Sequence, residues 1–274
     1  MQPIKVQTPE ETVITPMSKK SGNSKGPSKI ASTGRAGSGP KGKRSLNIKV
    51  KSAKGRKLSS TLWLQRQLND PYVQRAKDEG YRSRAAFKLL EIDDQFKLIR
   101  PGMTVIDLGA APGGWSQVAA TRCKSETGTG HNKGEVIAID ISEMDDIPGV
   151  TTFHLDFMDD SAPDVLKAAL RDGGADIVMS DMAAPATGHK QTDHLRIMGL
   201  AEAGLEFALE VLKPGGIYLA KVLQGGTENE LLTMMKKNFE KTRHVKPDAS
   251  RADSSELYVL AIGFKNAPAN KDEE

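Results

Sequence analysis

From residue 59 onward, the hydrophobic and polar positions follow two different periods, which predict two kinds of element. Short apolar runs rich in Val and Ile predict strands, one from residue 104 and others at 135–139, 151–155, 176–180, 217–222, 243–245 and 257–264. Apolar residues at helical spacing predict helices at 59–69, 71–79, 81–92, 115–123, 160–171, 192–212 and 228–239. Strands that alternate with helices predict an α/β fold built on an open sheet.

The strand from residue 104 runs into a glycine-rich turn that predicts a site for a nucleotide-type cofactor. Gly109, Gly113 and Gly114 permit a close approach of backbone to ligand. The spacing G-x-x-x-G-G differs from the dinucleotide pattern G-x-G-x-x-G, which disfavours a nicotinamide oxidoreductase. Asp107, two residues before the first glycine, favours an S-adenosylmethionine-dependent enzyme, because such enzymes often pair an acidic residue here with relaxed glycine spacing. A tight turn that binds no ligand is the alternative.

Four aspartates fall at the carboxyl ends of successive predicted strands, namely Asp107, Asp140, Asp156 and Asp181. Ligands of open α/β sheets bind beyond these ends, so we expect the four carboxylates at one ligand site. The carboxylate of Asp140 is suited to a ribose, because an ionised carboxylate can accept hydrogen bonds from both hydroxyls of a vicinal diol.

Two lysines need separate treatment. Lys221 stands inside the apolar run 217–222, where an ammonium is costly unless it is paired or used, and this favours a functional role. Lys88 lies in the predicted helix whose apolar stripe includes Ala86, Leu89 and Ile92. By pattern alone Lys88 is a solvated surface lysine.

The charge of the chain is divided unequally along its length. Residues 1–58 carry 14 Lys and Arg against 2 Glu, whereas the remainder has 25 Lys and Arg against 33 Asp and Glu. This Ser-, Gly- and Lys-rich segment predicts a disordered basic arm that contacts nucleic-acid phosphates, with a merely solubilising tail as the alternative. We expect three parts: the arm (1–58), one folded domain (59–266) and a frayed tail (267–274).

Composition argues against membrane, secreted, disulfide-bonded and zinc-binding proteins. No run approaches the length of a membrane span and no secretory signal is evident, which predicts a cytoplasmic protein, with an organellar transit peptide as a lesser option. The single Cys123 excludes an internal disulfide, and five scattered His give no zinc pattern, so no metal is expected.

Several motifs together resemble the FtsJ/RrmJ (RlmE) family of ribosomal RNA 2′-O-methyltransferases over residues 59–265. They are Asp-Leu-Gly-Ala-Ala-Pro-Gly-Gly-Trp-Ser-Gln (107–117), Ser-Asp-Met-Ala (180–183), Lys-Val-Leu-Gln-Gly (221–225), Lys-Pro-Asp-Ala-Ser-Arg (246–251) and Arg-Ser-Arg-Ala-Ala-Phe-Lys-Leu (82–89). The resemblance implies a Rossmann-like, seven-stranded, mostly parallel sheet with a reversed last strand and helices on both faces. It also implies a catalytic tetrad of Lys88, Asp181, Lys221 and Glu256.

The resemblance also implies a cofactor, a partner and a substrate. Together with the strand-end pattern, it places S-adenosylmethionine on Asp107, Gly109, Gly113, Trp115, Asp140, Asp156 and Asp181. The implied substrate is a uridine 2′-hydroxyl in the A-loop of 23S ribosomal RNA, within the large subunit and bound by a monomer. We expect the folded domain to contact RNA through a basic surface of Arg82, Arg84, Lys246 and Arg251.

The tetrad makes chemical sense for this reaction. A ribose hydroxyl is a weak acid, so methyl transfer from a sulfonium needs positioning and a general base. We assign Lys221 as the base, Asp181 as its orienting partner, and Lys88 with Glu256 as groups that position the ribose. Lys221 accepts a proton only as a neutral amine, which a neighbouring ammonium and desolvation favour and the carboxylates oppose.

The sequence departs from the family pattern at three places, and alternative substrates and functions remain open. The arm is long, the loop 124–134 is expanded, and 183–188 reads Ala-Ala-Pro-Ala-Thr-Gly where the family more often has Ala-Pro-Asn, so the substrate-side loop departs from the family pattern. Transfer RNA or a messenger cap is the alternative substrate. A noncatalytic RNA-binding protein is the alternative class, and the intact tetrad argues against it.

Overall fold

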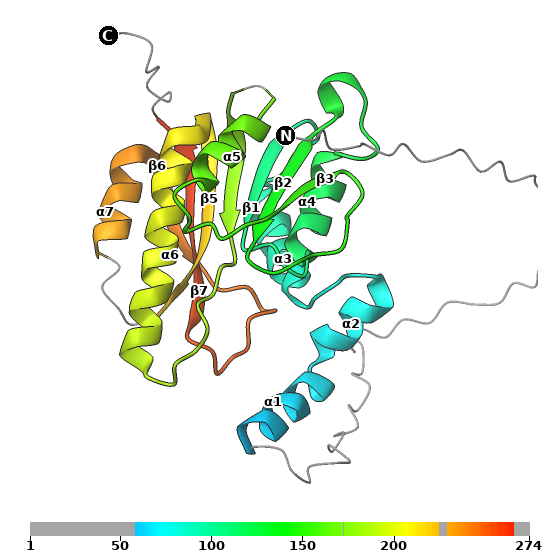
Figure 1. Ribbon diagram of the computed structural model, residues 1–274, viewed down its shortest axis with the longest axis vertical. Coiled ribbons are helices and arrows are strands. Elements are labelled where there is room, and N and C mark those ends of the chain that lie inside the picture. The colour runs from blue at the N-terminus through cyan, green and yellow to red at the C-terminus, as the bar shows by residue number, and fades with distance from the viewer. Residues whose placement is uncertain (1–57, 172, 225–228, 266–274) are drawn as a thin grey trace, which may run out of the picture. The chain divides into compact units, whose positions relative to one another are not determined.

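The computed structural model describes residues 58–171, 173–224 and 229–265 (Figure 1). All but one residue of the predicted basic arm and the whole predicted tail lie outside these ranges. The elements are α1 (Leu58–Asn69), α2 (Pro71–Glu79), α3 (Ala85–Phe96), β1 (Thr104–Leu108), α4 (Gly114–Cys123), the 3-10 turn η1 (Gly130–Asn132), β2 (Glu135–Asp140), β3 (Val150–His154), α5 (Ala162–Ala169), β4 (Ala175–Ser180), α6 (Lys190–Val211), β5 (Leu212–Leu223), α7 (Asn229–Asn238), β6 (Phe239–Val245) and β7 (Glu256–Phe264).

The strands form one seven-stranded sheet in the order β3-β2-β1-β4-β5-β7-β6. Neighbours from β3 to β5 are parallel, whereas β7 is antiparallel to both β5 and β6. The predicted mostly parallel sheet with a reversed last strand is confirmed. Because β7 is reversed, its first residue, Glu256, lies at the same edge as the carboxyl ends of β1, β4 and β5.

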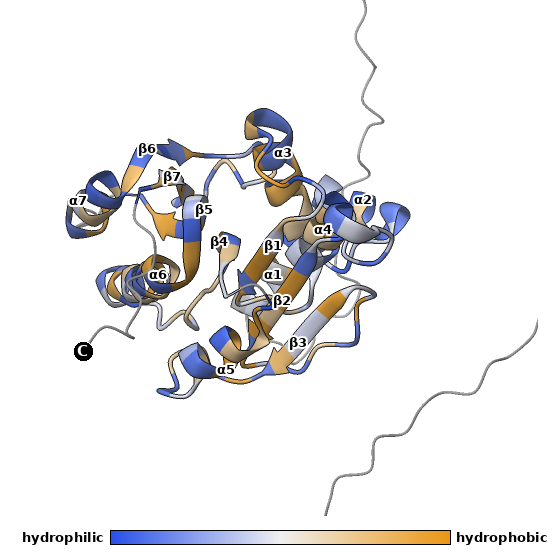
Figure 2. Cartoon of the chain, turned by 90° about the horizontal axis from the view of Figure 1, so that it is seen from above, coloured by the Kyte–Doolittle hydropathy of each residue, from blue (hydrophilic) through white to orange (hydrophobic). Residues whose placement is uncertain are grey.

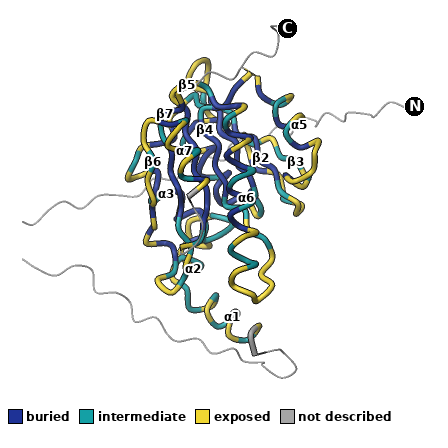
Figure 3. Tube along the Cα trace, turned by 90° about the vertical axis from the view of Figure 1, so that its left-hand side faces the viewer, coloured by how far each residue is buried: buried dark blue, intermediate teal, exposed yellow. Residues whose placement is uncertain are grey.

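Helices cover both faces of the sheet (Figure 2). Along β1, Ile106 packs in the core that includes residues of α5, α6 and α7, whereas Val105 packs in the core that includes residues of α3 and α4. Both side chains are fully buried, which is the expected result for a parallel strand covered on both faces. The strands β1, β2, β4, β5 and β7 are mostly buried, as the tube in Figure 3 makes plain, whereas the edge strands β3 and β6 are more exposed.

Several predicted boundaries differ from the structure; for example, the helix predicted at 81–92 is α3, Ala85–Phe96. β5 begins at Leu212, before the predicted strand, because Leu212 already pairs with Ala175 of β4. The turn that contains Gly215 (φ +83°) lies between this pair and the rest of the strand, and it forms a bulge in β5 instead of ending it. β6 spans seven residues instead of the three predicted. β3 ends at His154, so Asp156 lies in the loop that follows.

The N-terminal helices α1 and α2 match their predicted ranges to within one residue at each end. Asp70 caps α2 by accepting a 3.1 Å hydrogen bond from the Tyr72 amide, and Gly80 (φ +77°) ends the helix in a left-handed conformation. In α1, Leu68, one of the apolar residues at helical spacing, is 43% exposed.

Candidate active site

A cavity of about 680 Å³ opens at the carboxyl edge of the sheet. Gly109, Asp140, Asp156 and Asp181, which follow or end four different strands, contribute to its lining. Strand ends of a parallel sheet meet at one edge, so residues far apart in the sequence converge here. Apolar lining residues that the sequence reasoning missed are Ile139, Ile141, Phe157, Met158, Met182 and Leu200. Several directly follow a predicted aspartate, a signal that could have found them.

Two of the aspartates also shape the loops around the cavity. Asp140 accepts hydrogen bonds from the Ala111 amide (2.9 Å, Oδ2) and the Ser142 amide (2.7 Å, Oδ1). Asp156 accepts from the Met158 amide at 2.9 Å. A carboxylate that receives backbone donors keeps a fixed orientation and retains lone pairs for a ligand.

Gly109 is where the glycine-rich turn has no room for a side chain. Its φ is +75°, and a Cβ there would come within 2.5 Å of the Met182 side chain and 2.8 Å of the Met182 Cα. A residue larger than glycine would therefore push apart the loops after β1 and β4, both of which line the cavity.

Three predicted cofactor residues, Asp107, Gly113 and Trp115, are not among the residues that line this cavity. A Cβ on Gly113 would meet the side chain of Ile147 at 2.5 Å. Trp115 is 2% exposed and its indole donates a 2.8 Å hydrogen bond to the Ala85 carbonyl.

Asp107 is fully buried, and its Oδ2 accepts a 2.6 Å hydrogen bond from the Ser116 hydroxyl. Burial raises the pKa of the Asp107 carboxyl to about 7, the Ser116 hydroxyl opposes this, and the charges of Asp181 and Asp140 raise the pKa further. Its Oδ1 has no hydrogen-bond partner within the described chain.

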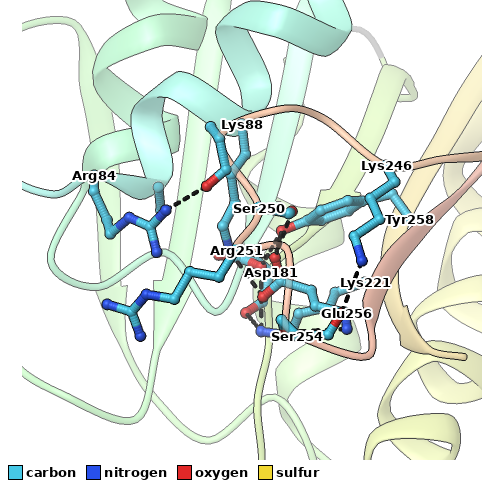
Figure 4. A network of polar contacts seen from close by, with 12 residues as sticks. Arg84, Lys88, Asp181, Lys221, Lys246, Ser250, Arg251, Ser254, Glu256 and Tyr258 are labelled. Carbon is cyan, nitrogen blue, oxygen red and sulfur yellow. Dashed lines mark hydrogen bonds and ion pairs between the residues drawn. The ribbon is translucent and has the colours of Figure 1, made fainter. Parts of the chain in front are cut away.

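The four residues of the predicted tetrad lie together beside the cavity (Figure 4). Lys88 Nζ is 2.7 Å from Glu256 Oε1 and 2.8 Å from Oε2, and 3.9 Å from Asp181 Oδ2. Lys221 Nζ donates a 2.5 Å hydrogen bond to the Asp181 main-chain oxygen and lies 3.2 Å from Asp181 Oδ1. Asp181 also lines the cavity, so the cavity and the tetrad share one carboxylate.

The sheet register explains how these side chains meet. Lys221 of β5 is paired with Tyr258 of β7, and Glu256 with Leu223. Side chains of paired residues point to the same face, and Tyr258 packs in the core on the α3 side. Lys221 therefore points toward α3, which carries Lys88.

The prediction from the helical pattern that Lys88 is solvated was wrong. Lys88 is 8% exposed and not the solvated lysine that the pattern alone suggests. Its long side chain runs along the core so that only the ammonium reaches the carboxylates, which a pattern of apolar positions does not reveal.

Tyr258 is a member of the cluster that the sequence reasoning missed. Its hydroxyl donates a 2.9 Å hydrogen bond to Asp181 Oδ1, and its ring lies beneath Lys88 Nζ at 5.7 Å from the ring centre. Burial, followed by the charges of Asp181 and Glu256, raises the pKa of Tyr258 well above its usual value. The phenol therefore stays a hydrogen-bond donor at all physiological pH values.

Of the residues predicted to contact RNA, the arginines are engaged within the protein. Arg82 donates to the Asp145 and Asp146 carbonyls, both at 2.6 Å. Arg84 and Arg251 each lie 3.2 Å from Asp70 Oδ2. The fourth residue, Lys246, is exposed and donates to the Ser254 carbonyl at 2.9 Å.

The described residues contain neither a membrane-spanning helix nor a cluster of metal ligands. No helix in this part of the chain is both long enough and apolar enough to cross a membrane. No group of three or more His, Cys, Asp or Glu side chains among the same residues is arranged to hold a metal ion.

The strand order and the reversed β7 define the Rossmann-like methyltransferase fold, and in this chain the cavity at the carboxyl edge of the sheet shares Asp181 with a lysine–carboxylate cluster. The family model of FtsJ-like methyltransferases matches residues 81–264. This chain belongs to that family.

The names of similar proteins are consistent with membership of this family. A protein of Parvibaculum lavamentivorans called ribosomal RNA large subunit methyltransferase E is 60% identical over 236 residues, which are 85% of this chain and 92% of the relative. A protein of Rhodospirillum rubrum with the same name is 57% identical over 254 residues, covering 93% and 95% of the two chains. A crystal structure from Plasmodium falciparum, described as a ribosomal RNA methyltransferase, has a TM-score of 0.60 and 32% identity, and the match covers 68% of this chain and all of that one.

Proposed function

We propose that this protein transfers a methyl group from S-adenosylmethionine to the 2′-hydroxyl of a uridine in the A-loop of 23S ribosomal RNA. The observation that carries the proposal is the pair of buried lysines held by Asp181 and Glu256 next to a cofactor-sized cavity. The ribosomal RNA target is supported by the names of relatives about 60% identical to this chain. We further propose that it acts as a cytoplasmic monomer on the large subunit.

The cavity suits S-adenosylmethionine in size and in chemistry. Drug- and cofactor-sized ligands occupy cavities of roughly 300 to 1,000 Å³, mostly apolar with a few polar anchors. Phe157 and Met158 offer apolar surface for a base, whereas Asp140 and Asp156 offer acceptors for ribose hydroxyls. Bound there, S-adenosylmethionine supplies an electrophilic methyl group on a sulfonium.

The contacts of Lys221 support its role as the general base. A neutral amine has two N–H donors and one lone pair. Asp181 offers two acceptors, its main-chain oxygen at 2.5 Å and Oδ1 at 3.2 Å. With both N–H groups directed to Asp181, the lone pair of a neutral Lys221 faces away from that residue and can accept the proton of the 2′-hydroxyl.

Lys88 and Glu256 have a different role in this proposal. Lys88 Nζ is held by both oxygens of Glu256 and remains near Asp181, so its positive charge stays fixed close to Lys221. A fixed ammonium can donate to ribose oxygens and can stabilise negative charge that develops on the attacking oxygen. Asp181 orients the amine of Lys221, as proposed from the sequence.

RNA binding in this proposal relies first on the basic arm and on Lys246. The arm carries 14 Lys and Arg, and Lys246 is exposed at the loop that leads to Glu256. Phosphates attract such residues regardless of sequence. Arg82, Arg84 and Arg251 are less exposed than Lys246, and any RNA contact they make would come in addition to their bonds within the protein.

The experiment compares RNA substrates with labelled S-adenosylmethionine. Large ribosomal subunits, small subunits and bulk transfer RNA from a strain that lacks this methyltransferase are each incubated with the purified full-length protein. We expect label in large subunits alone. Transfer to transfer RNA but not to large subunits would support the alternative substrate, and no transfer to any RNA would support a noncatalytic RNA-binding protein.

A further inference from the structure

Helix α3 and the residue that precedes it, Arg84, present three side chains to the loop 246–255, which connects β6 to β7. Arg84, Lys88 and Glu91 are spaced by four and three residues, so they lie on one face of the helix. Arg84 and Glu91 contact the loop itself, and Lys88 contacts Glu256 where the loop ends. The same helix face thus holds a catalytic lysine and the loop that leads to its carboxylate partner.

Ala249 is the point at which α3 holds this loop. Its carbonyl accepts a hydrogen bond from the guanidinium of Arg84, and its amide donates a 2.7 Å hydrogen bond to Glu91 Oε2. The side chain is fully buried and packs in a small cluster with Ala76 and Phe87. Both backbone groups of one loop residue are therefore tied to α3, which leaves the next residue little freedom.

Ser250 is that next residue, and it contacts the tetrad. It is 6% exposed, and its hydroxyl donates a 2.9 Å hydrogen bond to Glu256 Oε1. The same carboxylate oxygen lies 2.7 Å from Lys88 Nζ. Glu256 Oε1 is thus shared between a serine hydroxyl and a lysine ammonium, as Figure 4 illustrates.

The outer side of the loop has a second attachment. Asp70, the residue that caps α2, lies 3.2 Å from both Arg84 and Arg251 and its side chain is 7% exposed. Arg251 directly follows Ser250, so the loop is held on both sides of that serine.

We propose that Ser250 is a positioning residue that fixes the carboxylate of Glu256 against Lys88, and that Arg84 and Glu91 hold the loop so that Ser250 can do so. This rests on the proposed function, because the consequence is expressed in methyl transfer. Ser250 contacts neither the cofactor cavity nor Lys221 within the described residues, so it acts through Glu256. A rotated Glu256 would leave Lys88 without its closest partner.

The first test replaces Ser250 by alanine and uses Ser255→Ala as the matched control. Ser255 is an exposed serine of the same loop, so the control makes the same chemical change without touching a buried hydroxyl. We expect Ser250→Ala to lower kcat about tenfold, the scale of a lost hydrogen bond to a charged group, with S-adenosylmethionine affinity and the KM for large subunits within about twofold of wild type. Ser255→Ala should match wild type. A Ser250→Ala enzyme with unchanged kcat would overturn the inference.

The second test asks whether Ser250 acts through Glu256. In a Glu256→Ala background, adding Ser250→Ala should change the single-turnover rate by less than about twofold, because the group that Ser250 positions is already absent. The same fractional loss in both backgrounds would show a general structural effect and contradict the inference.

A structural measurement keeps the inference separate from the proposed function. Crystals of Ser250→Ala should show the Glu256 carboxylate rotated away from Lys88 or divided between two conformers. If the wild-type protein methylates no RNA but this rotation is seen, the proposed function fails and the positioning role stands. A carboxylate left in place within the wild-type contact distance would refute the role whatever the activity.

Discussion

Lys221 contacts Asp181 twice, through a 2.5 Å hydrogen bond to the main-chain oxygen and a 3.2 Å approach to Oδ1. The main-chain bond ties the lysine to the loop after β4, so the orientation of its amine does not depend on the side chain of Asp181 alone. The side chain of Asp181 also lines the cavity at the carboxyl edge of the sheet.

Lys221→Ala should lower the single-turnover rate of methyl transfer by about 10² to 10⁴, the usual contribution of a general base. Affinity for S-adenosylmethionine, measured by calorimetry, should change little, because Lys221 does not line the cavity. Lys221→Met, which keeps the length of the buried side chain, serves as the control for packing and should be equally slow. A rate within tenfold of wild type in either variant would remove Lys221 as the base.

Asp140→Ala should weaken S-adenosylmethionine binding while the far-ultraviolet circular dichroism stays that of the wild type. Asp140 lines the cavity and also accepts the Ala111 and Ser142 amides, so its loss removes a ligand contact and loosens two loops. Asp140→Asn, which keeps one acceptor oxygen, should fall between wild type and alanine. Calorimetry should detect no NAD binding in any of the three; tight NAD binding without S-adenosylmethionine binding would reverse the assignment of the cofactor.

Asp107 should make the stability of the protein pH-dependent. Burial raises the pKa of this carboxyl from 3.8 to about 7, so the folded protein binds a proton that the unfolded chain has lost. The contribution to stability is therefore greatest at low pH and decreases as the pH rises through this window, by at most about 1.4 kcal/mol per pH unit.

Asp107→Asn removes the titration but keeps an acceptor for the Ser116 hydroxyl. The free energy of unfolding of wild type, relative to this variant, should decline from about pH 4, near the unfolded pKa, to about pH 7 and level off above that range. Denaturant titrations at a series of pH values measure this difference. A difference that is constant with pH would show that Asp107 is ionised throughout.

Deletion of residues 1–57 should leave a protein that binds S-adenosylmethionine as the full chain does but binds RNA more weakly and with less salt dependence. The deleted segment is strongly basic, whereas the described domain is rich in acidic residues, so its removal weakens the attraction to phosphates. Each phosphate contact that is lost reduces the slope of log affinity against log salt by roughly 0.7 to 0.9. Equal slopes for both proteins would show that the arm only aids solubility.

The order of helices and strands could be predicted because the spacing of apolar residues and the positions of turn-forming residues are local features of the sequence. The strand-end aspartates were found in the same way, and Asp140, Asp156 and Asp181 do line one cavity. Lys221 was conspicuous because a charge interrupts an apolar strand, and it is 9% exposed in the structure.

Other features of the site could not be predicted, because they depend on contacts between residues that are far apart in the sequence. Lys88 looked solvated because the sequence of its own helix carries no signal of its contact with Glu256, which lies 168 residues later in the chain. Arg84 and Arg251 looked like RNA contacts, and their shared contact with Asp70 appears only in three dimensions. Tyr258 was missed because a tyrosine in a strand is ordinary, and only the β5–β7 register brings it to Asp181.

The most direct test of the central claim identifies the atom that receives the methyl group. Large subunits methylated by the wild-type protein are digested to nucleosides and to oligonucleotides, and both are analysed by mass spectrometry, with Lys221→Ala as the control. The account predicts one 2′-O-methyluridine in the A-loop of 23S ribosomal RNA, absent when Lys221→Ala is used. A methyl group on a base, or on a ribose elsewhere with the A-loop unmodified, would contradict it.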